Sequence, residues 1–285
     1  MQRRTLPMLV LLVCILVACG GGPTTPTAEQ YFSDAKKNLA TLDYEAALKN
    51  LDRLVKSAEG QPLAQQGTVL RTALLTSMAE ASSKMAEAYG SGAGQPDAAS
   101  RQSQFIKMKS DYYGIARVRL MNSMEAVMAQ RSNLGDQSLA LDIAFPDFTG
   151  TDPAAISKVQ KGQWVDDNAR YRAELEIVRN ALAGTLARLA GAADTNKGRA
   201  AFEKGGVQID PRVYLLELSN MFYRLSEMFD RRALDDSRYR RISLEVVRDN
   251  ADVVLILLEK KPDKELETRA KKLKADCEAA LKKIG

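Results

Sequence analysis

Side chains that could carry out nucleophilic or acid–base chemistry are scarce in this sequence of 285 residues. It contains no histidine, and its three cysteines are Cys14, Cys19 and Cys277. The absence of histidine excludes Ser-His-Asp and Cys-His nucleophilic sites, histidine-ligated zinc and imidazole acid–base catalysis. Carboxylate and lysine chemistry remain open, but the adjacent carboxylates Asp166 and Asp167 are better explained as helix caps. We therefore predict no catalytic residue, no metal ligand and no cofactor.

The amino-terminal residues have the order of an export signal. Arg3 and Arg4 precede the uninterrupted apolar run 9–17, and the small residue Ala18 follows it. A helix needs about 20 apolar residues to span a bilayer, and this run is shorter. A basic start, a short apolar run and a small residue at the cleavage point are typical of a secretory signal peptide. We therefore expect residues 1–18 to be removed on export.

The four residues Leu16-Val-Ala-Cys19 resemble the lipobox of bacterial lipoproteins. The resemblance implies that Cys19 carries a diacylglycerol thioether, that cleavage occurs before it, and that its new amino group is acylated. Two or three acyl chains hold a protein on a membrane far more firmly than one. In this family an aspartate after the cysteine retains the protein at the inner membrane. Gly20 therefore implies attachment to the outer membrane, with the protein facing the periplasm.

The cysteine content agrees with lipid attachment. Exported proteins use cysteines in disulfide pairs or avoid them. Cleavage would remove Cys14, and acylation of Cys19 would leave Cys277 without a partner in the same chain. One lipid anchor and one buried thiol explain this content. The alternative is a simple cleaved signal in which Cys19 is incidental.

Segment 19–27 is predicted to be a flexible tether that begins with the lipidated cysteine. After Cys19 it contains only Gly, Pro and Thr, so it has no large apolar side chain to bury. The formal net charge of the chain is +5, which is too small to indicate nucleic-acid binding, and export also argues against that partner. The expected partners are the membrane, through the amino-terminal lipid anchor, and another protein.

Helical periodicity begins at residue 28, and we assign region 28–132 to a TPR-like helical unit. Segment 31–55 is predicted to form a hairpin of two helices and resembles a tetratricopeptide repeat (TPR). Ala47 matches the small position of the second TPR helix, and Tyr31 and Ala35 match the large and small positions of the first. Other positions depart from the repeat, and a generic helical hairpin is the alternative.

Two long helices are predicted next. Pro62 opens the first, whose apolar residues repeat every three or four positions until the glycine-rich segment 90–94. That segment is predicted to be a linker, because no lysine with Ser or Thr follows it at the spacing of a phosphate-binding loop. The second helix is predicted over residues 98–131.

Residues 133–165 form the irregular part of the sequence, with one short helix expected at 153–161. Phe145, Phe148 and the only tryptophan, Trp164, belong to this segment. A connection of this length in a helical protein is usually functional or disordered, and aromatic residues argue against disorder. The rings either pack onto the helices or line a pocket. They are the residues that we predict to contact a ligand or partner.

Region 166–285 again has helical periodicity. One helix follows the Asp166 cap, a loop is expected over 191–211, and three amphipathic helices with short connections come last. Cys277 lies on the apolar side of the final helix and is predicted to be buried and unreactive. Strand signals are nearly absent. The sequence therefore predicts an all-α fold of stacked antiparallel helical hairpins, TPR-like at the amino-terminal end and bundle-like at the carboxyl-terminal end.

Three functions agree with these features. The preferred one is a non-enzymatic lipoprotein that binds another protein in the cell envelope, as a scaffold or assembly factor. The second is a ligand-binding accessory of a solute transport system, because the chain loosely resembles TPR-containing lipoproteins of TRAP-type transporters. An enclosed pocket walled by the aromatic rings of 133–165 would favour it. The third is an envelope enzyme that uses carboxylates.

Overall fold

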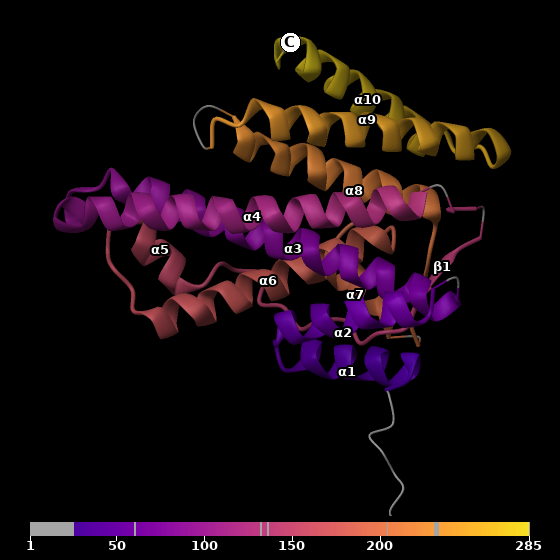
Figure 1. Cartoon of the computed structure of the whole chain (residues 1–285), viewed down its shortest axis with the longest axis horizontal. Coiled ribbons are helices and arrows are strands. Elements are labelled where there is room, and N and C mark those ends of the chain that lie inside the picture. Colours follow the sequence, from indigo (N-terminus) through magenta and orange to yellow (C-terminus); the bar gives the residue numbers. More distant parts are fainter. Residues whose placement is uncertain are drawn as a thin grey trace, which may run out of the picture.

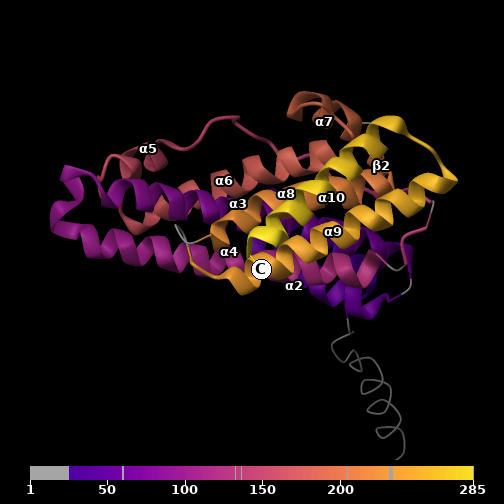
Figure 2. The same cartoon turned by 90° about the horizontal axis from the view of Figure 1, so that it is seen from above.

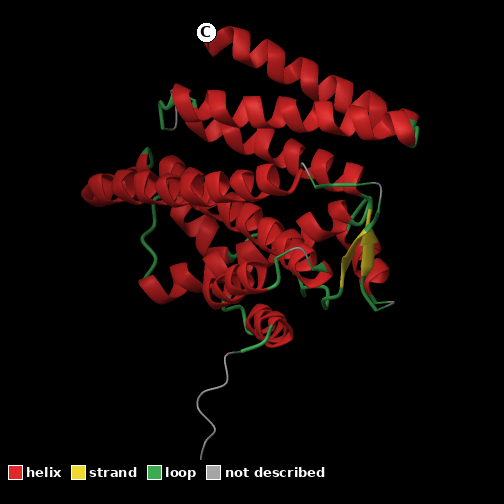
Figure 3. Ribbon diagram, turned by 45° about the vertical axis from the view of Figure 1, so that its right-hand side comes forward, coloured by secondary structure: helices red, strands yellow, loops and turns green. Residues whose placement is uncertain are grey.

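Helices make up most of the described chain. A computed structural model describes residues 26–59, 61–131, 133–135, 137–203, 205–230 and 234–284. These residues form ten α-helices, two short 3-10 helices and two three-residue strands, so the predicted all-α fold is confirmed (Figure 3). The predicted signal peptide, the lipid attachment residue Cys19 and most of the predicted tether lie outside the described residues.

In chain order the α-helices of the described residues are α1 (Ala28–Ala40), α2 (Tyr44–Ser57), α3 (Pro62–Ala93), α4 (Gln102–Arg131), α5 (Ala154–Gln160), α6 (Asp167–Leu189), α7 (Thr195–Phe202), α8 (Pro211–Leu225), α9 (Ser237–Lys260) and α10 (Lys264–Ile284). The 3-10 helices are η1 (Pro96–Arg101) and η2 (Ser226–Phe229). The strands are β1 (Leu139–Leu141) and β2 (Val207–Ile209).

Local capping fixes where several helices begin. The side chains of Thr27, Asp43 and Asp166 each accept a hydrogen bond from a backbone N–H in the first turn of α1, α2 and α6. Pro62 and Pro211 stand at the start of α3 and α8, where an N–H group has no partner within the helix. The helix starts predicted at Pro62 and after Asp166 are therefore confirmed.

Helix α3 lies at the centre of the molecule. Helix α4 runs antiparallel beside it, and α2, α5, α6 and α8 also pack on it. Figures 1 and 2 show the α3–α4 pair with the α1–α2 hairpin on one side and α8, α9 and α10 in successive layers on the other. One hydrophobic core extends through all of these layers, from Phe32 in α1 to Cys277 in α10.

Burial on several sides explains why α3 contains so many hydroxyl side chains. The sequence predicts one apolar stripe on this helix, but Thr72, Thr76 and Ser77 are also fully buried. Each of the three donates a hydrogen bond to the carbonyl oxygen four residues earlier. The hydroxyl oxygen of Thr76 also lies 2.7 Å from that of Ser123 of α4, and the hydroxyl oxygen of Ser77 lies 3.1 Å from that of Thr185 of α6. Paired in this way, small polar residues can be buried where the helices approach closely.

Two segments predicted to be irregular are partly ordered. Segment 191–211 contains α7 and β2, and segment 133–165 contains β1 as well as the expected short helix α5. Strands β1 and β2 pair antiparallel, with Leu139 opposite Ile209 (Figure 3). Three residues are too few to show the alternation by which a strand is recognised in a sequence.

The predicted linker at 90–94 is wrong, because α3 continues to Ala93. Gly92 stands in the last turn of α3, where α5 packs on this helix. A Cβ atom at this position would lie 2.1 Å from the carbonyl oxygen of Val159 and 2.7 Å from the Phe105 ring. Glycine is therefore required here by close packing and does not mark a flexible connection.

Cys277 is fully buried in α10, as predicted. Burial raises the pKa of its thiol to about 12. None of the helices within the described residues is long and apolar enough to cross a membrane.

Candidate binding groove

Two of the predicted contact residues, Phe145 and Phe148, pack against α7. The Phe145 ring lies 6.2 Å from that of Phe148 and 5.4 Å from that of Phe202 in α7. The guanidinium of Arg199 stands 5.2 Å from the Phe148 ring. Both rings are half-buried and hold the segment before α5 against the helices.

Trp164, the third predicted contact residue, packs on other helices, the α3–α4 pair. Its ring lies edge-on to Phe105 at 5.8 Å and to Tyr89 at 6.4 Å. The guanidinium of Arg101 covers it at 5.4 Å. The structure therefore separates Trp164 from the pair Phe145 and Phe148. None of the three lines the groove described next, and their role in binding stays a prediction.

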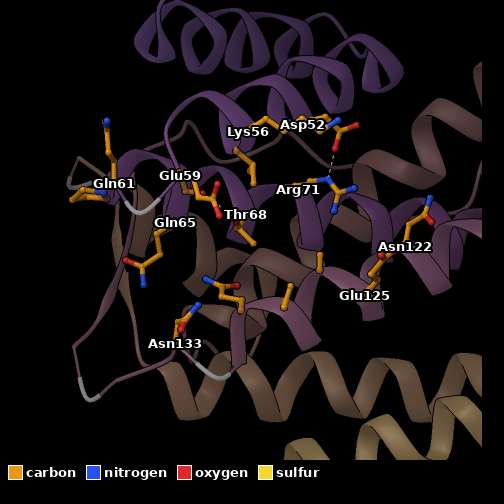
Figure 4. Close-up of a pocket in the computed structure, with 16 residues that line it drawn as sticks. Asp52, Lys56, Glu59, Gln61, Gln65, Thr68, Arg71, Asn122, Glu125 and Asn133 are labelled. Atoms are coloured by element: carbon orange, nitrogen blue, oxygen red, sulfur yellow. Dashed lines mark hydrogen bonds and ion pairs between the residues drawn. The ribbon is translucent and has the colours of Figure 1, made fainter.

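A groove of about 680 Å³ opens over the start of α3, between α2 and α4. Both flanking helices pack on α3, which forms the floor. The groove is lined by Asp52, Val55, Lys56 and Glu59 in and after α2; by Gln61, Pro62, Ala64, Gln65, Thr68 and Arg71 at the start of α3; and by Asn122, Glu125, Ala126, Ala129, Gln130 and Asn133 at the end of α4. Figure 4 shows Gln65 and Thr68 directed toward the space that Asn133 borders.

Amide side chains are the distinctive part of this lining. The side chains of Gln61, Gln65, Asn122 and Asn133 are exposed and make no hydrogen bond to any described residue. Each carboxamide offers two N–H donors and one carbonyl acceptor. The groove therefore presents both donors and acceptors from two facing sides.

Gln130 is the amide that is held in place. The hydroxyl of Tyr214 in α8, a fully buried residue, donates to its Oε1 at 2.9 Å. Its Nε2 is shielded from solvent and has no hydrogen-bond partner among the described residues. The next residue, Arg131, donates to Asn250 of α9 at 3.3 Å. The carboxyl-terminal end of α4 is thus fixed from behind by α8 and α9.

Ion pairs connect the walls of the groove. The guanidinium Nε of Arg71 on the floor lies 2.5 Å from Asp52 of α2. One turn before Asn122, Arg119 of α4 forms an ion pair with Glu45 of α2 at 2.7 Å. The charges of Asp52 and Arg71 cancel each other, and the other charged side chains of the lining include both acidic and basic residues. No net field of one sign is therefore built into the groove.

The described lining offers hydrogen-bonding groups and exposed charges. The groove contains no thiol and no base hydrogen-bonded to a nucleophile, and no group of three or more carboxylates or thiols among the described residues is placed to hold a metal ion. Sequence reasoning did not identify this groove. Its residues come from three helices and, in the sequence, resemble ordinary solvated surface positions.

Comparison with known proteins gives no independent assignment for the groove. No model of a known protein family, no curated protein sequence and no solved structure matches this chain.

Proposed function

We propose that the chain is a membrane-anchored lipoprotein without catalytic activity, which binds another protein in the bacterial cell envelope as a scaffold or assembly factor. The order Leu16-Val-Ala-Cys19 supports the lipid anchor. The observation that carries the binding role is the groove over α3, whose amide side chains have no partners within the described chain. Exposed amides around an open groove can exchange their hydrogen bonds to water for the hydrogen bonds of a protein interface.

The anchor is tested by fractionating cells that express the Cys19→Ala variant. We expect the variant to keep its helical circular dichroism spectrum and to leave the membrane fraction, because Cys19 is the proposed site of acylation. The wild-type chain should stay with the membrane after a high-salt wash, which removes proteins held only by charge. Retention of the variant under the same wash would show that the membrane is not bound through Cys19.

The binding role is tested by placing a photoreactive amino acid at single positions in living cells. A probe at Asn122 in the groove should give a discrete cross-linked protein product, which mass spectrometry identifies. A probe at Gln104, which is also exposed but lies at the other end of α4, is the matched control. Equal products at both positions, or none at Asn122, would contradict a docking role for the groove.

A ligand-binding accessory of a solute transport system is the second candidate, and one observation favours it. A cavity of about 510 Å³ lies between α6, α8 and α10. It is bordered by Arg188 and by the ion pair of Arg269 with Glu217, and three further carboxylates line it, those of Asp210, Asp263 and Glu265. The Nε of Arg188 is shielded from solvent without a hydrogen-bond partner among the described residues, and burial lowers the pKa of this guanidinium. Calorimetric titration with small solutes that carry an amino group, a carboxyl group or both tests this candidate, and Arg188→Met should change any heat of binding.

A further inference from the structure

We propose that the groove over α3 takes an extended, uncharged peptide segment of its partner and recognises mainly the main chain of that segment. This inference rests on the proposed protein-binding function and names the chemistry of the partner. An extended peptide presents alternating N–H donors and carbonyl acceptors on each side. The groove presents carboxamides, which combine a donor and an acceptor in one planar group with the same chemistry as a peptide bond.

The position of the amides agrees with a chain lying along the groove. Gln61 and Gln65 stand one helical turn apart on the floor, at the start of α3, and Asn122 and Asn133 lie on the α4 side of the groove. The part of α4 from Asn122 to its end at Arg131 spans about 14 Å, which is the length of about four residues of extended chain. Amides on the floor and on the α4 side can therefore bond to one short strand.

The remaining lining leaves room for that strand. The walls and floor between the amides carry small residues, among them Ala64, Ala126 and Ala129. Small side chains let a main chain approach the helices closely, as glycine and alanine do where helices pack. Deep apolar sockets that would select particular large side chains are not formed by residues of this size.

The charges in the groove favour an uncharged segment. Asp52 and Arg71 already neutralise each other at 2.5 Å. The other charged side chains of the lining, Lys56, Glu59 and Glu125, have both signs and are exposed. A strongly acidic or basic segment, or a phosphorylated one, would meet charges of its own sign without a compensating cluster.

The test measures binding of fluorescein-labelled peptides to the purified chain by fluorescence polarisation. The probes are octapeptides of Ala, Ser, Thr and Val, each made with its normal amide bonds and with two central amides replaced by esters. Esters lack the N–H donor and have a weaker carbonyl acceptor. We expect the amide peptides to bind, scrambled sequences to bind within about threefold, and the ester forms to lose about tenfold in affinity.

Variants of the chain locate the binding. Each of Gln65→Leu and Asn122→Leu should weaken binding about fivefold, and both together about 30-fold, through loss of hydrogen bonds. Gln104→Leu, at an exposed position of α4 outside the groove, should leave affinity unchanged. The variants change exposed side chains, and an unchanged urea midpoint confirms that they fold.

Three results would overturn the inference: no binding of the amide peptides, equal binding of the ester peptides, or affinity unaffected by the two groove substitutions. Any of these combined with a cross-link at Asn122 in cells would mean that the groove docks a folded surface, so the proposed function would stand without this inference. Peptide binding in the groove without a cellular cross-link would instead count against the proposed function.

Discussion

Gly92 provides the sharpest quantitative test of how the central helices pack. Alanine is favoured over glycine in helices by up to about 1 kcal/mol, so propensity alone predicts that Gly92→Ala, in the last turn of α3, stabilises the protein. The structure predicts the opposite, because the new Cβ would lie 2.1 Å from the carbonyl oxygen of Val159. That oxygen cannot move freely, since it accepts a hydrogen bond from Gly162 at 2.9 Å. Gly162 has a φ of +82° and itself adjoins Ala98.

Overpacking a close contact costs about 1–3 kcal/mol, and a clash with backbone atoms belongs in the upper part of that range. After the helical gain is subtracted, Gly92→Ala should destabilise the protein by about 1–2 kcal/mol. Gly114→Ala in α4 is the matched control, because no atom lies within 4 Å of the added Cβ. It should stabilise the protein by about 1 kcal/mol, the propensity difference alone.

Urea unfolding followed by circular dichroism at 222 nm measures both changes. We expect the midpoint to fall for Gly92→Ala and to rise for Gly114→Ala, with the denaturant slope unchanged in each. A Gly92→Ala protein at least as stable as the wild type would refute the close approach of α3 and α5. A fall for both variants would mean that α4 does not run as a regular helix through residue 114.

Three further predictions concern buried side chains. The Cys277 thiol should not react with a disulfide reagent in the folded protein and should react at once in urea, because it is fully buried and its pKa is raised to about 12; fast reaction of the native protein would contradict this. Stability should decline as the pH rises above about 9, since burial raises the pKa of Cys277 and of Tyr44, Tyr112 and Tyr214, so that the unfolded chain releases protons that the folded chain retains. These contributions are fully present below pH 8, and a urea midpoint that stays level from pH 8 to 11 would be the contrary result. Trp164 should be quenched by acrylamide more weakly than free tryptophan, because Phe105, Tyr89 and Arg101 cover parts of its ring; equal quenching would exclude this packing.

The helices could be predicted because their signals are local. Pro62 and Asp166 mark helix starts by properties of one or two residues, and the apolar spacing around Cys277 defines a buried stripe by itself. The same local reasoning underestimates how much of α3 is buried, because it treats threonine and serine as surface residues. Thr76 shows why these residues can be buried: its hydroxyl forms hydrogen bonds with its own helix and with Ser123.

The structure within the two predicted irregular segments could not be foreseen in the same way. Strand β1 exists only because β2 pairs with it, and nothing near Leu139 specifies Ile209 as its partner. Helix α7 does carry a local signal that could have been used. Asp194 caps it by accepting a hydrogen bond from the N–H of Lys197, and Phe202 is the apolar residue that attaches it to Phe145.

The groove was invisible in the sequence for a different reason. The sequence pattern around an exposed glutamine or asparagine is the same whether its side chain points into bulk water or into a groove. Only the arrangement of the helices distinguishes the two positions. What separates Gln130 from its neighbours is its bond to Tyr214, 84 residues away, and its unpaired Nε2. A buried donor without an acceptor costs the folded protein about 1–3 kcal/mol, and neither this cost nor the bond to Tyr214 can be read from the residues next to Gln130 in the sequence.

The position of the groove also bears on the proposed anchor. Helix α2, which forms one wall, belongs to the first hairpin after the predicted tether, and α1 begins at Ala28. Nine residues from Cys19 to Thr27 reach at most about 30 Å when fully extended. A partner segment held against α2 by an acylated chain would therefore stay close to the membrane surface. Lengthening the tether with an inserted Gly-Ser stretch should preserve peptide affinity in vitro but weaken any function in cells that depends on this proximity, whereas equal loss of both would place the tether itself in the binding site.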